Sequence, residues 1–90
     1  MSDIYRVQGP LTLDTVKSQI PALDGMLAQG DVIVDLSCVT ETDSSAAALL
    51  LAWCRSAKNA ERTIKLVDVP EGLRRLIAVY GLGELLPLSV

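Results

Sequence analysis

Two hydrophobic patterns alternate along the chain, one with the spacing of strands and one with the spacing of helices. Short runs rich in β-branched and other apolar residues predict four strands. These runs lie at positions 4–8, 11–13, 31–36 and 63–67. Gly9 and Pro10 separate the first two runs and predict a turn there.

In three further segments the apolar residues recur every three or four positions, which predicts helices. These segments are residues 16–29, 46–60 and 71–80, and an apolar tail at 82–88 is expected to form a last short helix. The first segment carries its apolar face on Val16, Ile20, Leu23 and Leu27. We expect it to end at Gly30 and to kink or restart at Pro21, because proline lacks the backbone N–H that a helix interior needs.

The predicted order is therefore β-β-α-β-α-β-α with a short C-terminal helix, in a single domain over residues 1–90. Neither a linker nor a repeat interrupts the sequence. Alternating strands and helices predict the α/β class, with a mixed β-sheet, crossover connections and helices packed against the sheet.

The chain has 90 residues, of which 50% are hydrophobic and 21% are charged, and its formal net charge is −3. This acidic balance argues against binding to nucleic acid and against a polybasic membrane patch, because both need clustered lysine and arginine. The longest apolar run, residues 46–54, is far shorter than the roughly 20 residues of a membrane span, so we expect no direct membrane insertion. The N-terminus lacks the apolar segment of a signal peptide, which indicates a cytoplasmic protein. In that compartment Cys38 and Cys54 are expected to be free, buried thiols.

The chain contains no histidine, which removes the commonest general base and every histidine-dependent nucleophile or metal site. It has no glycine-rich phosphate-binding motif, and its 11 acidic residues are scattered. A hydrolytic pair of Asp43 and Ser44 would lack a base for the hydroxyl. We therefore predict no catalytic residue, no metal and no cofactor, and hence a protein that is not an enzyme.

The helix predicted at 46–60 has one apolar face and one face of mixed character. Its core face consists of Ala46, Leu49, Leu50, Trp53, Ala57 and Ala60. The opposite face carries the polar Ser44, Arg55, Lys58 and Asn59 and, among them, the apolar Ala47, Ala48 and Leu51. Two interpretations are open. Either a neighbouring loop partly covers this face, or the face is a flat surface of small residues that a partner protein approaches closely.

Asp43, Ser44 and Ser45 open the same helix and also admit two interpretations. Aspartate and serine are preferred N-cap residues, so one of these side chains should accept a hydrogen bond from a backbone amide of the first turn. Alternatively, the Ser44 hydroxyl is a phosphorylation site at the positive end of the helix dipole. A phosphate at Ser44 would then change the charge of the face that also carries Leu51.

The sequence VDLSCV at 34–39, followed by TDSSAAALLLAW at 42–53, resembles the corresponding part of STAS domains. Further segments that resemble parts of such a domain are GPL at 9–11, LRRL at 73–76, YGL at 80–82 and LLP at 85–87. The resemblance implies a small α/β domain that acts through partner proteins. Among STAS domains the chain looks most like the MlaB branch.

By that resemblance the chain would be a cytoplasmic accessory subunit of a phospholipid ABC transporter that maintains outer-membrane lipid asymmetry. It would bind an MlaF-like ATPase subunit and, through it, the membrane permease, and so lie at the periphery of the inner membrane. The residues that we assign to partner binding are Ser44, Ala47, Ala48, Leu51, Arg55 and Lys58, with Asp43 and Ser45 as loop and cap residues.

The same family contains anti-anti-sigma factors, and this branch is the alternative. In these proteins a kinase phosphorylates a serine in an Asp-Ser-Ser or Asp-Ser-Gly turn, and the unmodified protein sequesters the kinase. By this resemblance the partner would be an anti-sigma kinase, and Ser44 would be the phosphate acceptor. The Gly-Leu-Gly that usually follows the turn is replaced here by three alanines at 46–48.

Overall fold

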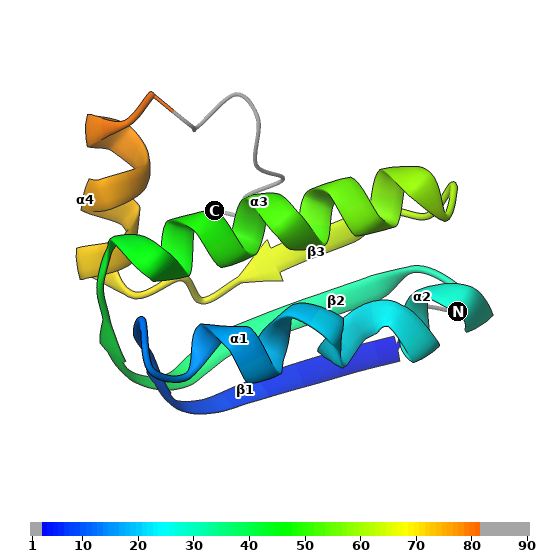
Figure 1. Ribbon diagram of the computed structural model, residues 1–90, viewed down its shortest axis with the longest axis horizontal. Coiled ribbons are helices and arrows are strands. Elements are labelled where there is room, and N and C mark those ends of the chain that lie inside the picture. Colours follow the sequence, from blue (N-terminus) through cyan, green and yellow to red (C-terminus); the bar gives the residue numbers. More distant parts are fainter. Residues whose placement is uncertain (1–2, 82–90) are drawn as a thin grey trace.

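The computed structural model describes residues 3–81, in which strands and helices follow one another along the chain (Figure 1). The strands are β1 (Asp3–Leu11), β2 (Val32–Thr42) and β3 (Ile64–Val67). The helices are α1 (Val16–Gln19), the 3-10 helix η1 (Ile20–Leu23), α2 (Asp24–Gln29), α3 (Ser44–Asn59) and α4 (Glu71–Val79). The short helix predicted at 82–88 lies outside the described residues.

The three described strands form one parallel sheet in the order β1-β2-β3. This corrects the prediction of a mixed sheet. Helices connect β1 to β2 and β2 to β3, and such crossovers return the chain in the same direction. Along each strand, side chains alternate between the helix-covered face and the opposite face. The opposite face carries the exposed Ile4 and an ion pair in which Arg6 Nε lies 3.1 Å from Asp35 Oδ2.

The N-terminal region contains one strand where two were predicted. Strand β1 is continuous to Leu11, and Leu13 lies in the turn that follows it. Gly9 and Pro10 do not end the strand, because they form an irregularity inside it at which the register against β2 shifts. Gly9 adopts a φ of +84°, which glycine tolerates. Since β1 is at an edge of the described sheet, Pro10 removes no donor that a second neighbouring strand would need.

The first predicted helix forms three short helical segments. Pro21 stands at the start of η1, which confirms the predicted restart, and Gly30 follows the last residue of α2. A 3-10 helix has about 3 residues per turn in place of 3.6, so the apolar face rotates through η1. As a result Leu23 and Leu27 are buried, whereas Ile20 is 46% exposed.

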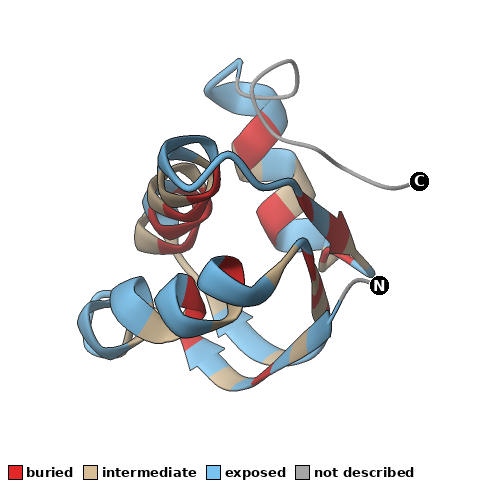
Figure 2. Cartoon of the chain, turned by 90° about the vertical axis from the view of Figure 1, so that its right-hand side faces the viewer, coloured by how far each residue is buried: buried red, intermediate tan, exposed pale blue. Residues whose placement is uncertain are grey.

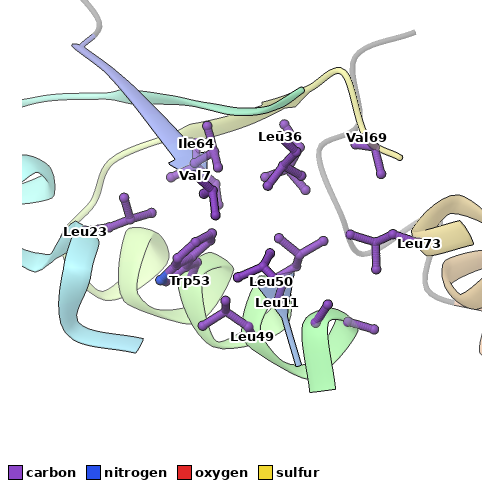
Figure 3. Close-up of a cluster of buried hydrophobic side chains, with 14 of the residues drawn as sticks. Val7, Leu11, Leu23, Leu36, Leu49, Leu50, Trp53, Ile64, Val69 and Leu73 are labelled. Carbon is purple, nitrogen blue, oxygen red and sulfur yellow. The ribbon is translucent and has the colours of Figure 1, made fainter. Parts of the chain in front are cut away.

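The core lies between the sheet and the helices, where the buried residues of the strands and of η1, α2, α3 and α4 face inward (Figures 2 and 3). Trp53 is fully buried within it. The Trp53 indole N–H donates to the carbonyl oxygen of Gln19 at 2.9 Å, and its ring meets the Tyr5 ring edge-on with 6.1 Å between the centroids. Trp53 thereby connects α3 to both α1 and β1.

Helix α3 confirms most of its predicted core face. Of the six residues predicted to face the core, five are buried, namely Ala46, Leu49, Leu50, Trp53 and Ala57. Ala60 was assigned to the core but is exposed, because the helix ends at Asn59.

The prediction of two buried thiols is wrong, although both cysteines are free. Cys38, on β2, is exposed. Cys54 is half-buried on the side of α3. Burial raises the pKa of the Cys54 thiol, so this group stays protonated at neutral pH and behaves as an apolar side chain.

Candidate partner-binding site

Asp43 provides the N-cap of α3 and also binds the turn that follows β1. Asp43 Oδ1 accepts a hydrogen bond from the Ser45 N–H at 2.8 Å, and Oδ2 accepts one from the Leu13 N–H at 3.1 Å. The Asp43 N–H in turn donates to the Leu11 carbonyl oxygen at 3.3 Å. The cap prediction is therefore confirmed, and the carboxylate, not a serine hydroxyl, makes the cap.

The two amide hydrogen bonds also determine the charge of Asp43. The bond from Leu13, and after it the bonds from Ser45, lower the pKa of the carboxyl below its ordinary value of 3.8. A carboxyl group whose pKa is lower in the folded protein than in the unfolded chain stabilises the fold while it is ionised. This contribution is complete when the pH is above the ordinary pKa, and it is lost as the pH falls through the pKa of the folded protein.

We expect Asp43→Ala to lower the melting temperature by several degrees at neutral pH, because the first turn of α3 and the Leu13 N–H each lose an acceptor. The difference from the wild type should shrink as the pH falls below the ordinary value of 3.8 and through the lowered pKa of the folded protein, where the wild-type carboxyl becomes protonated. Thermal unfolding between pH 2.5 and 7 measures both effects. Asp14→Ala, at an exposed aspartate in the same turn, is the matched control. A constant difference at every pH would contradict the assigned role of the carboxylate.

One line of residues on α3 faces outward, and we call it the α3 ridge. It consists of Ser44, Ala48, Leu51, Arg55 and Lys58. Spacings of four, three, four and three place these residues on one side of the helix. Leu51 is half-buried and packs partly against the core, while the other four are exposed. The structure thus brings together five of the six residues that the sequence assigned to partner binding.

Ala47 is the exception, because only 2% of its surface is exposed and it belongs to the hydrophobic core. The predicted assignment of Ala47 to a partner-binding face is therefore wrong. Helix α4 packs against α3 and lies beside its first turns (Figure 1), so this part of α3 is covered on a second side. The periodicity of α3 alone contains no information about that second contact.

Two shallow hollows that are lined by described residues lie beside the α3 ridge. One, of about 400 Å³, is lined by Leu51, Cys54, Arg55 and Lys58. The other, of about 220 Å³, lies between α3 and the segment that contains α1 and η1. Its lining is Leu13, Val16, Ile20, Ser45, Ala48, Leu49 and Ala52. The sequence did not single out Leu13 and Ile20 as surface residues, because Leu13 was predicted in a strand and Ile20 on a core face.

The Ser44 hydroxyl is at the first residue of α3 and is exposed. Among the residues that the structure describes, no side chain or backbone group makes a hydrogen bond to it. The same residues contain no group of three or more potential metal ligands. No helix within residues 3–81 combines the length and the apolar character that crossing a membrane requires.

The groups that the α3 ridge presents to solvent are the Ser44 hydroxyl, a small apolar patch at Ala48 and Leu51, and the cationic side chains of Arg55 and Lys58.

Comparison with known proteins places the chain in a family. A family model described as "Mlab, STAS domain" matches residues 2–87. The chain belongs to the STAS domain family. No curated protein sequence matches this STAS domain.

The fold of this STAS domain is similar to a solved structure of the anti-sigma factor antagonist SpoIIAA in its unphosphorylated form. The TM-score is 0.73 at 19% sequence identity, over 97% of this chain and 78% of that chain. The predicted α/β class and STAS fold are confirmed by this similarity, with the corrections to the N-terminal strand and to the sheet given above.

Proposed function

We propose that this STAS domain is a non-catalytic subunit that binds the ATPase of a phospholipid ABC transporter through the α3 ridge. The observation that carries the proposal is the exposed ridge itself, with Ser44 free of the capping role and Ala48 and Leu51 beside it. The match to a family model described as "Mlab, STAS domain" supports the transporter as the setting. The domain would then act at the cytoplasmic side of the inner membrane, held there by the ATPase and the permease.

The composition of the ridge suits a contact between proteins. Ala48 has a side chain of one methyl group, which lets a partner approach the helix closely. Leu51 offers an apolar centre, and Arg55 and Lys58 form a charged edge, an arrangement typical of interfaces with an apolar core and a polar rim. In such a contact the partner supplies the catalytic machinery, and this domain contributes only its surface.

The second candidate function is that of an anti-anti-sigma factor. The observation that favours it is the exposed Ser44 hydroxyl, which the Asp43 cap leaves available as a phosphate acceptor. The similarity of fold to an anti-sigma factor antagonist is compatible with this alternative as well. A phosphate on Ser44 would add a charge of about −1.5 to −2 to the ridge and expel a bound kinase.

Ser44→Asp tests the role of the ridge, because its effects on stability and on binding should have opposite signs. An acidic residue in the first turn of a helix is favourable, so the melting temperature should stay unchanged or rise. Binding to the ATPase should weaken at least about tenfold, since the contact would take the new carboxylate of the ridge out of water. Isothermal titration with the purified ATPase subunit measures the change, and Ser44→Thr, which keeps the hydroxyl, is the control.

A second measurement separates the two candidate partners. The domain is incubated with ATP and a purified anti-sigma kinase, and its intact mass is compared with that of Ser44→Ala and Ser45→Ala. The transporter proposal predicts stable binding to the ATPase and no gain in mass. Addition of one phosphate to the wild type and to Ser45→Ala, but not to Ser44→Ala, together with no binding to the ATPase, would contradict it.

A further inference from the structure

The hollow between α3 and the α1–η1 segment has apolar walls that face solvent. Leu13 is 69% exposed and Ile20 is 46% exposed, although both are large hydrophobic residues. They stand opposite Ala48 and Ala52 of α3, whose short side chains leave the space between them open. None of the described residues that line the hollow is charged. This combination marks a place where apolar surface is exposed to water without a contact inside the described part of the chain.

The size of the hollow indicates what it can hold. Its volume of about 220 Å³ is below the range of about 300–1,000 Å³ that small-molecule sites occupy. A cofactor or lipid would therefore fit poorly, whereas one large apolar side chain of another protein would fit. Anchor side chains of this kind contribute most of the binding free energy at many interfaces.

Both walls of the hollow are held in place by hydrogen bonds. The Leu13 N–H donates to Asp43 Oδ2, which fixes the turn against the start of α3. Ile20 directly follows Gln19, whose carbonyl oxygen accepts the indole N–H of the buried Trp53. The hollow is thus preorganised, and a ligand that enters it does not have to order these segments.

The charged side chains beside the hollow indicate the charge of the segment that would bind there. Ala48, Ala52 and Arg55 follow one another along α3 at spacings of four and three, and Lys58 continues in the same direction. From Ser45 to Lys58 the helix rises about 20 Å, which is the length of a helix of about 14 residues. A partner helix lying along α3 would have its apolar stripe over the hollow and one end over two cationic side chains.

We infer that the hollow receives a large apolar side chain from an amphipathic helix of the partner, and that acidic residues at one end of that helix face Arg55 and Lys58. The inference rests on the proposed function, because it assumes that the partner binds along α3. It adds Leu13 and Ile20 to the binding surface and specifies the chemistry of the segment that binds there.

The test measures the dissociation constant of the purified ATPase subunit for variants of the domain. Leu13→Asn and Ile20→Asn should each weaken binding at least about tenfold, because each removes one apolar wall. Val79→Asn is the matched control, since Val79 is 78% exposed on α4, and it should leave the dissociation constant unchanged. Arg55→Glu should also weaken binding at least about tenfold, and the wild-type affinity should fall as the salt concentration rises. Thermal unfolding of each variant shows whether it is folded.

The outcomes separate this inference from the proposed function. If Ala48→Arg abolishes binding but Leu13→Asn and Ile20→Asn bind like the wild type, the hollow is not occupied and the inference is overturned, while the proposed function stands. If the two asparagine variants weaken binding but Arg55→Glu has no effect, the acidic character of the partner helix is overturned. If the wild-type domain does not bind the ATPase at all, both proposals fail.

Discussion

Replacing Ala48 by arginine is expected to weaken the complex with the ATPase at least about 100-fold and to leave the fold intact. Ala48 is exposed on the α3 ridge between Ser44 and Leu51, so a long cationic side chain there would separate the two surfaces and leave a charge in an apolar contact. Arginine is a good helix former, so the change should not disturb α3 itself. Titration calorimetry gives the affinity, and thermal unfolding shows that the variant is folded.

Two further variants complete that experiment. Ala78→Arg makes the same substitution at an exposed alanine of α4 and should bind like the wild type. Leu51→Arg should also abolish binding, but Leu51 is half-buried and packs against the core, so some loss of stability is expected as well. Unchanged affinity of a folded Ala48→Arg would show that the partner does not approach the α3 ridge.

The second large effect concerns stability. We expect Trp53→Ala to lower the free energy of unfolding by about 3–5 kcal/mol, the usual cost of removing a large buried aromatic side chain. Domains of this kind are stable by about 5–15 kcal/mol, so the variant should be close to unfolding. Trp53 is fully buried and connects three elements through its contacts with Gln19 and Tyr5. The urea midpoint should fall by on the order of 2 M.

Trp53→Phe serves as the control for this measurement. Phenylalanine keeps an apolar ring in the core but cannot donate a hydrogen bond to the Gln19 carbonyl. The remaining loss, about 1–3 kcal/mol, reports the unsatisfied acceptor and the smaller ring. Equal urea midpoints for the wild type and Trp53→Ala would contradict the central place of Trp53 in the core.

Much of the fold was predictable because it depends on local patterns. The β-branched run around Val34 forms β2, the alanine- and leucine-rich run forms α3, and Pro21 and Gly30 interrupt or end helices as expected. Each of these features follows from backbone geometry or from a periodicity that lies within one segment.

The errors came from contacts between segments. Ala47 is buried because α4 covers a second side of α3, and the periodicity of α3 cannot reveal this. Gly9 and Pro10 form an irregularity in an edge strand, and whether such a pair turns the chain depends on where the strand lies in the sheet. Ile20 faces solvent because the 3-10 turn at Pro21 rotates the apolar face of the segment. The presence of a proline in the sequence does not by itself specify that rotation.

The part of the candidate site that depends on residue spacing within α3 was predictable from the sequence. The spacing along α3 placed five ridge residues on one face, and the structure agrees. Which of Asp43, Ser44 and Ser45 caps the helix was open, because all three are suitable N-cap residues. The structure assigns the cap to Asp43, and this leaves the Ser44 hydroxyl exposed.

Nuclear magnetic resonance cross-saturation tests the central claim most directly, because it reports which surface of the domain touches the partner. The domain is labelled with deuterium and nitrogen-15 and mixed with the unlabelled ATPase subunit, whose protons are then saturated. We predict loss of signal at the amides of Ser44, Ala48 and Arg55, with little loss at Ile4 and Lys65 on the opposite face of the sheet. Loss confined to Ile4 and Lys65, with the α3 amides unaffected, would show that the domain binds through its sheet and that α3 is not the docking surface.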